Sequence, residues 1–400
     1  MASAVTARPL PPLPQFKGRP GWEFTDLSKV EVDAYEPALP GNPHAVERAV
    51  ALFDPPDESH QLAEVDGAVL AGAVEVDGAY VGPLDSAPAA ASQLIGTVVS
   101  SDDPFVVRND AARNQGACVY VPRGVTLSAP AMLAGIQEAG GRAVNRRTLI
   151  VLEEDAQAEV WEQYLSAGDE LDGLFNAVVE IVVGPNARLR YVCGQGLSER
   201  SLVFGTQRAV VDANGSLEWI ALGFGGGTGR MSMETELRGP GAEARVTGAY
   251  ATRRRQHVDF DTTQEHAAAH TTSDLAFRGV LADRSSSVWR GMIKVDPGAQ
   301  QTDAFQDNRN LLLSKRAHAD AIPGLEILAN DVRCTHAAAV AQIDRDQLFY
   351  LMSRGLPRDA ATRLIIDGFL QSLVERFGEG ALHDAVSSAL ERRLAAILDS

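Results

Sequence analysis

The sequence is poor in cysteine, which excludes several common kinds of site. Its 400 residues contain three cysteines, Cys118, Cys193 and Cys334, which are odd in number and far apart. Such a set does not form the disulfide framework of a small secreted domain. No CxxC pair occurs, so the usual ligand pattern of a structural zinc site or a ferredoxin-type cluster is missing. We therefore expect free thiols in a reducing compartment.

Long apolar runs and an excess of positive charge are also lacking. No stretch approaches the roughly 18 apolar residues that a membrane-spanning helix needs, and the first residues contain no apolar run of the signal-peptide kind. The formal net charge is −17 and the pI is about 4.9. Because nucleic acids and anionic membranes repel an acidic chain, neither is an expected partner. Together these absences predict a cytoplasmic protein.

From about residue 105 the sequence contains short alternations of apolar and polar residues, which are typical of β-strands. No amphipathic helix is indicated between about residues 145 and 340. This argues against a doubly wound α/β fold, because its parallel strands need crossover helices. A β-sandwich and a β-solenoid of stacked coils both remain. The strand-like runs are 117–127, 147–164, 176–193, 202–223, 233–251 and 274–295.

Turn-forming clusters divide these runs roughly every 30 residues. They lie at residues 153–155, 184–186, 212–215 and 239–241. The region before the runs is less informative. Residues 1–20 are proline-rich and expected to be loosely ordered, residues 44–53 predict a short helix, and residues 54–100 show little periodicity and are expected to be irregular.

After Ile343 the pattern becomes helical. Asp344, with Gln347 three residues later, resembles a capping box, and Gly355 marks the end of this first helix. Pro357 opens a second helix, and a third is expected over residues 381–398. The apolar stripe expected on the second helix is Leu364, Ile365, Phe369, Leu373 and Phe377. The stripe expected on the third is Leu382, Val386, Leu390, Leu394 and Ile397.

The sequence therefore predicts three parts. Residues 1–104 form an N-terminal extension that is partly helical, residues 105–342 form the β core, and residues 343–400 form a C-terminal helical domain, against which the extension could pack.

Motifs that suggest an enzyme are incomplete. The glycine-rich stretch 223–230 lacks the Gly-Lys-Ser/Thr ending of a phosphate loop, so a turn between coils is favoured and ATP hydrolysis is not expected. Asp259, Asp261 and Glu265 could form the carboxylate cluster of a β-helix polysaccharide enzyme. Solvated surface positions explain these three carboxylates better.

The histidines of the same region allow two interpretations. His266 and His270 are four residues apart and would share one face of a helix, where they could bind a metal ion. Strand-like sequence flanks them, however, so a helix is not favoured. We expect a structural role for these two residues and for His257.

Three sequence blocks, closely spaced and in order, point to a family. They are TDAFQDNRNLLLS at 302–314, PGLEILANDVRCTH at 323–336 and QLFYLMSRG at 347–355. Together they resemble the SufB/SufD family, the scaffold subunits of the SUF iron–sulfur cluster assembly system. A segment with Trp22, Phe24, Thr25, Asp26 and Leu27 also resembles a motif in the N-terminal extension of that family.

The resemblance decides between sandwich and solenoid. It implies a mainly β protein with a right-handed parallel β-helix core, an N-terminal extension and a C-terminal α-helical domain. It also implies a scaffold that is not an enzyme.

Cys334 and His336 are the candidate metal ligands. Residues i and i+2 of a strand point to the same face, and a thiolate and an imidazole both bind ferrous iron well. On these residues alone, a buried cysteine beside a surface histidine is the preferred interpretation. The resemblance implies instead an interface with SufB, where both residues serve the shared cluster site and SufB supplies the other ligands. Ala337 stands where the family usually has glycine, which removes access to positive φ.

The resemblance also implies a branch of the family. The block at 302–314 contains no cysteine where SufB-type chains have one, and Asn308 stands near that place. Cys334 and His336 also stand where SufB carries a Glu-His-Glu run. Both differences favour SufD. The alternatives are a SufB-like scaffold that builds a cluster alone and a β-helix polysaccharide enzyme.

Two partners follow from the resemblance. The chain pairs with SufB through the β-helix core and docks the SufC ATPase through the C-terminal helices. Alone it binds no cofactor tightly; in the complex it holds iron or a cluster transiently, and FADH₂ is a further cofactor that the resemblance allows there. The candidate contacts to SufC are Phe349, Tyr350, Arg354, Leu364, Ile365 and Phe369.

Overall fold

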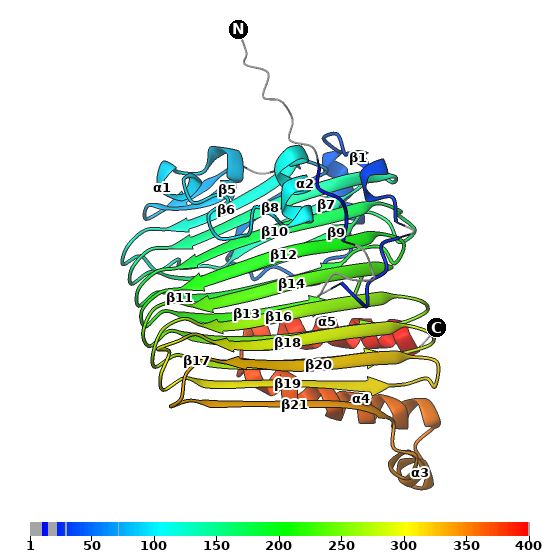
Figure 1. The fold of residues 1–400 in the computed structure, drawn as a ribbon. Coiled ribbons are helices and arrows are strands. Elements are labelled where there is room, and N and C mark those ends of the chain that lie inside the picture. Colours follow the sequence, from blue (N-terminus) through cyan, green and yellow to red (C-terminus); the bar gives the residue numbers. More distant parts are fainter. Residues whose placement is uncertain (1–9, 15–21, 29, 71, 399–400) are drawn as a thin grey trace.

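The chain winds into a two-sheet parallel β-helix (Figure 1). The computed structural model describes residues 10–14, 22–28, 30–70 and 72–398. From residue 115 on, consecutive strands alternate between the two sheets, and each pairs in parallel with the strand two places later. One coil takes roughly 30 residues. The structure thus confirms the predicted parallel β-helix core with C-terminal helices.

The strands of the first sheet are, in spatial order, β20 (His318–Ile327), β18 (Ser286–Val295), β16 (His257–His266), β14 (Thr228–Leu237), β12 (Leu202–Val211), β10 (Leu174–Val183), β8 (Arg142–Leu152), β6 (Gln115–Val121), β5 (Ala79–Pro83) and β4 (Val74–Val76), with β1 (Glu36–Pro37) beside β8. Those of the second sheet are β21 (Arg333–Gln342), β19 (Asp303–Leu312), β17 (Thr272–Leu281), β15 (Glu243–Thr252), β13 (Ser216–Gly223), β11 (Arg188–Gly196), β9 (Gln157–Ser166), β7 (Ala131–Gln137), β2 (His60–Val65) and β3 (Ala68–Val69).

The N-terminal third is more regular than the sequence predicts. Residues 54–100 are not irregular: they contribute β2, which pairs with β7, and β5, which pairs with β6. Helix α2 (Pro104–Ala112) is also not predicted; the Asp103 carboxylate caps it by accepting from the backbone N–H groups of Phe105 and Val106. The helix expected at 44–53 is the short 3₁₀ helix η2 (Pro43–Arg48). Most of the proline-rich stretch 1–20 lies outside the described residues.

A ladder of left-handed residues closes one edge of the β-helix. Asp155, Asn186, Asn214 and His270 have positive φ, and each donates its backbone N–H to a carbonyl of the next coil. Asn and Asp tolerate this conformation better than most side chains. The predicted turn clusters recur because every coil needs such a turn. The glycine-rich stretch 223–230 likewise contains the predicted turn, between β13 and β14.

Three helices follow the last strand: α3 (Arg345–Ser353), α4 (Arg358–Val374) and α5 (Ala381–Leu398). The Asp344 cap and the positive φ of Gly355 confirm the predicted start and end of α3. Helices α4 and α5 pack on the outer face of the second sheet, where they share an apolar core with Trp161, Val192 and Ile220. The helices are therefore built onto the β-helix.

The buried face of α4 differs from the predicted stripe. Ile366, Leu370 and Leu373 are buried, whereas Leu364 is 52% exposed. Two apolar rows with the same spacing run along this helix, and sequence periodicity alone cannot tell which one faces the sheet. The stripe predicted on α5 is confirmed, since all five of its residues are buried.

The outer face of the first sheet carries ion pairs. Asp259 and Asp261 accept from Arg230 at 2.7 and 2.5 Å, and Glu265 accepts from Lys294 at 2.5 Å. The prediction that these carboxylates are solvated is wrong. Strand alternation places them among cationic residues of adjacent coils, which the linear sequence does not reveal.

The N-terminal motif lies on this same face. The Thr25 hydroxyl donates to Asp259 at 2.6 Å, and the Trp22 ring stacks on Phe105 at 5.6 Å between centroids. The guanidinium of Arg230 lies 4.5 Å from the Trp22 ring. The motif is therefore a strap that covers ion pairs of the first sheet.

His266 has the structural role that the sequence predicts. It ends β16 and is completely buried, and its Nδ1 and Nε2 lie 2.7 and 2.8 Å from the hydroxyls of Thr271 and Ser273. Burial lowers the pKa of His266 to about 4. His270, on a turn, does not share a helix face with it.

The buried histidine predicts a loss of stability in mild acid. The pKa of His266 is about 4 in the folded protein and about 6.5 in the unfolded chain. Between these two pKa values the unfolded state binds more protons than the folded state. The stabilisation that comes from the neutral, buried His266 is therefore complete above pH 6.5 and is lost as the pH falls towards 4. Between pH 7 and pH 5 we expect His266 to remove about 2 kcal/mol from the free energy of unfolding, measured with urea.

The variant H266Q should flatten this pH dependence of the free energy of unfolding, and the exposed-site control H44Q should not. An unchanged slope in H266Q would contradict the assignment.

Candidate functional site

The β-helix ends in a coil whose two outermost strands have free edges. β20 is the last strand of the first sheet and β21 the last of the second. Each pairs with a strand on one side, β18 and β19 respectively. Unpaired backbone N–H and C=O groups on a strand edge are a template for another strand. Figure 1 shows both strands at the end of the stack, next to α3 and α4.

Cys334 and His336 lie on β21, the terminal strand of the second sheet. They stand in register with Ala304 and Gln306 of β19. Gln306 faces the interior, because its side-chain amide donates to the carbonyls of Gly291 and Gly324 in the first sheet. By strand alternation Cys334 and His336 share this inward face, at the point where the interior opens to solvent. Their predicted common face is confirmed.

The two side chains differ in environment. Cys334 is half-buried against an apolar cluster that includes Ile293 and Val295, whereas His336 is exposed. Burial, and secondly the carboxylate of Asp303, raise the pKa of the Cys334 thiol. Since metals bind the thiolate, ligation at Cys334 has to release a proton.

The pair could supply only part of a coordination shell. Within the described residues there is no group of three or more His, Cys, Asp or Glu side chains placed to hold one metal ion. A tetrahedral site needs four ligands. A thiolate and an imidazole on one open face could therefore serve a metal whose remaining ligands come from elsewhere.

The other two cysteines are inaccessible. Cys193 is buried inside the coils, Cys118 is buried on the outer face of the first sheet beneath Leu84 and Ala91, and burial raises the pKa of each thiol to about 12. The Sγ atom of Cys193 accepts from the Gln207 amide at 3.7 Å. Neither thiol can act as a nucleophile or ligand without opening of the core.

Apolar side chains surround the open end. Leu325 and Ile327 of β20 stand in register with Ile293 and Val295 of the preceding coil and are 37% and 39% exposed. Val340 of β21 is 43% exposed. In an inner coil the same positions are covered by the next coil. Sequence reasoning misses this rim, because its alternation does not differ from that of buried strands.

A second apolar surface lies on α3 and α4. Phe349, Tyr350 and Leu364 are 72%, 55% and 52% exposed, and the guanidinium of Arg354 lies 5.1 Å from the Tyr350 ring. Ile365 and Phe369 are half-buried. Met352, absent from the predicted set, is 40% exposed on the same helix as Phe349. None of the described helices is long and apolar enough to span a membrane.

The accessibility of Cys334 predicts selective labelling. In the native protein a maleimide should modify Cys334 and leave Cys118 and Cys193 intact, and the rate should rise with pH because the pKa of Cys334 is raised. Peptide mass spectrometry identifies the site. The variant C334S should not react until denaturant is added. Native labelling of Cys118 or Cys193 would show that the coils open more readily than the structure indicates.

Comparison with known proteins identifies the family. Residues 135–369 match the family model described as SUF system FeS cluster assembly, SufBD core domain. The chain is 32% identical over 282 residues to the iron–sulfur cluster assembly protein SufD of Bacillus subtilis, covering 70% of this chain and 64% of that protein. It is 27% identical to SufB of the same organism, covering 68% and 58%. An iron–sulfur cluster assembly SufBD family protein of Staphylococcus epidermidis is 27% identical, with coverage of 68% and 59%. These matches span less than two thirds of each relative. The chain belongs to the SufBD family of iron–sulfur cluster assembly proteins.

Proposed function

We propose that this chain is a non-catalytic scaffold subunit of the SufD type, which assists iron–sulfur cluster assembly in the cytoplasm. The observation that carries the proposal is the open end of the β-helix. There the terminal coil places Cys334 and His336 on an inward face, between two free strand edges and beside exposed apolar side chains. Iron or a nascent cluster is the cargo of this site.

The partner at the open end is a second β-helix of the SufB type. A chain with the same two-sheet coils could continue both sheets by pairing with β20 and β21. It would also cover Leu325, Ile327 and Val340, which a monomer leaves in water. The partner would bring the ligands that Cys334 and His336 lack. That SufB is a relative of this chain supports a pseudo-symmetric pair built from the same fold.

The cysteine inventory favours the SufD type. The block at 302–314 has Asn308 near the place where SufB-type chains carry a cysteine, and the Asn308 side chain is buried and contacts Tyr250 and Asn310. Cys118 and Cys193 are both buried. Cys334 is thus the one accessible thiol of the three, which is too few to build a cluster without a partner.

The α3–α4 surface is the docking site for the SufC ATPase. Its exposed side chains Phe349, Tyr350 and Leu364 are large and apolar, as in the centre of protein interfaces. The opposite face of α4 packs on the second sheet, in a core that includes Val280 of β17 and Leu311 of β19. Movement of the ATPase would therefore reach the sheet that carries Cys334 and His336. Through this connection, nucleotide-driven movement of the ATPase would open or close the cluster site.

A β-helix polysaccharide enzyme is the less supported alternative. Its carboxylates would have to be free to protonate a leaving group or take up a proton. Asp259 and Asp261 are bound to Arg230, and the Thr25 hydroxyl donates to Asp259. Glu265 is bound to Lys294. These residues hold the fold together and leave no accessible acid–base pair in that cluster.

Substitution of His336 tests the cargo site. The wild type and H336A should each form a complex with the cognate SufB and SufC under anaerobic co-expression. The H336A complex should contain at least about tenfold less iron and sulfide, because a ligand is lost. The matched control is H318A, since His318 is an exposed histidine on the opposite strand of the same coil. A full cluster in H336A would refute the ligand role and leave the scaffold proposal standing; failure of the wild type to form the complex would refute the scaffold proposal itself.

The docking surface is tested by a charge placed in it. L364D should weaken binding to SufC by about tenfold or more, measured by calorimetry, because a carboxylate is desolvated in an apolar interface. Leu39 is 77% exposed and lies outside α3 and α4, so L39D is the matched control and should bind normally. Both variants should keep the wild-type free energy of unfolding within about 0.5 kcal/mol. Equal binding by L364D would place the ATPase elsewhere.

A further inference from the structure

A cleft several coils before the open end has the features of a small-molecule site. It is lined by the chain turns that follow β9, β11, β13 and β15, by helix α5 and by residues 50–52, and its volume is about 400 Å³. This is within the range of ligand pockets in proteins. The cleft contains neither Cys334 and His336 nor the α3–α4 surface, so the proposed function does not account for it.

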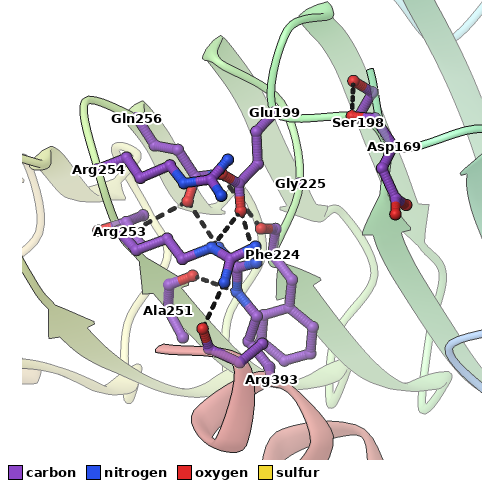
Figure 2. Close-up of polar contacts among 12 residues, drawn as sticks. Asp169, Ser198, Glu199, Phe224, Gly225, Ala251, Arg253, Arg254, Gln256 and Arg393 are labelled. Carbon is purple, nitrogen blue, oxygen red and sulfur yellow. Dashed lines mark hydrogen bonds and ion pairs between the residues drawn. The ribbon is translucent and has the colours of Figure 1, made fainter. Parts of the chain in front are cut away.

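Three arginines converge on one carboxylate in this cleft (Figure 2). Oε1 of Glu199 accepts from Nε of Arg253 at 2.6 Å and from Nη1 of Arg393 at 3.1 Å. Its Oε2 accepts from Nη1 of Arg254 at 3.4 Å. The side chains of Glu199, Arg253 and Arg393 are 15%, 19% and 12% exposed. Three positive charges therefore share one negative charge, and two of the three guanidinium groups are poorly solvated. Arg392 lines the same cleft.

The arginines are held to different degrees. Arg393 also donates from Nε to the Ala251 carbonyl at 2.8 Å and from Nη2 to Gln256 at 2.6 Å, so all its nitrogens are occupied. Arg254 is 61% exposed, and within the described residues its guanidinium has only the long contact to Glu199. Arg393 thus fixes Glu199, while Arg254 stays free to turn towards a ligand.

The remaining charges do not remove the excess. Asp169 and Glu170 line the cleft, but Glu170 is paired with Arg200, which is not a lining residue. The electrostatic cost of bringing like charges together is relieved when an anion binds.

We propose that this cleft binds a small organic phosphate ester. A phosphate carries close to two negative charges at neutral pH. This balances the excess of two positive charges that remains when three guanidinium groups share one carboxylate. Guanidinium forks bind phosphate oxygens in a bidentate manner. The cleft walls include Val50, which is 73% exposed, and the half-buried Leu52, which give an apolar surface for the body of the ester.

The test measures binding of phenyl phosphate and of inorganic phosphate to the full-length protein by calorimetry, at constant ionic strength set with sodium chloride. Phenyl phosphate should bind at least about tenfold more tightly than inorganic phosphate, because its ring meets the apolar wall. The variant R254A should weaken both by about tenfold, since one charge-assisted contact is lost. The matched control R123A removes an exposed arginine, 68% accessible and paired with Glu154, from the opposite edge of the β-helix and should bind as the wild type does.

Each outcome decides the proposal. Equal affinity for the two phosphates would support an inorganic phosphate site and overturn the ester. Tighter binding of citrate than of phenyl phosphate would overturn the phosphate. If phenyl phosphate bound no more tightly than chloride, or if R254A bound it with wild-type affinity, the site itself would be overturned. The variant E199Q provides an independent check: with the competing carboxylate removed, phenyl phosphate should bind at least as tightly as to the wild type.

Discussion

The hydrogen bonding of each coil to the next is the constraint on which this structure depends. Every inner strand satisfies its two backbone edges with the coils before and after it, and every inner side chain is covered by the next coil. A stack of this kind cannot satisfy its own last coil. β20 and β21 therefore end with free edges, with Leu325 and Ile327 uncovered and with Cys334 and His336 facing an opening instead of a neighbour. The position of the candidate site follows from the fold, and its residues lie where this β-helix leaves its last coil open.

The outer faces of the two sheets are covered by different parts of the chain. Outward-facing positions of the second sheet include apolar residues, as at Trp161, Val192 and Ile220, which share an apolar core with α4 and α5. Outward-facing positions of the first sheet include ion pairs, as between Arg230 and Asp259, and the N-terminal strap lies there. Inside the coils, the completely buried Arg146 is accommodated because Nε donates to Glu162 at 2.8 Å and Nη1 to Glu64 at 2.5 Å. This buried charge is thus placed where two carboxylates of the facing sheet stand beside it.

Sequence patterns predict the features that depend on local order. The strand alternation, the turn that closes each coil, the start of α3 at Asp344 and the buried stripe of α5 all repeat at short spacing, and all are confirmed. Features that depend on contacts between coils are missed. The carboxylate of Asp259 is ion-paired to Arg230 across the sheet, and the buried row of α4 is Ile366 and Leu370 instead of Leu364. For the same reason, the common face of Cys334 and His336 could be predicted from strand geometry, whereas the apolar rim beside them could not.

The arrangement of helices also bears on how the open end could be controlled. β21, which carries both candidate ligands, belongs to the sheet that α4 braces from outside, and β20 belongs to the sheet that the described helices α4 and α5 leave uncovered. A force on α4 would therefore act first on β17 and β19, whose Val280 and Leu311 share its apolar core, and would reach β21 through its pairing with β19. Close-packed interiors transmit such displacements because they have little free volume. If an ATPase docks there as proposed, the quantity that it would change is the distance between the two terminal strands, more than the orientation of either candidate ligand alone.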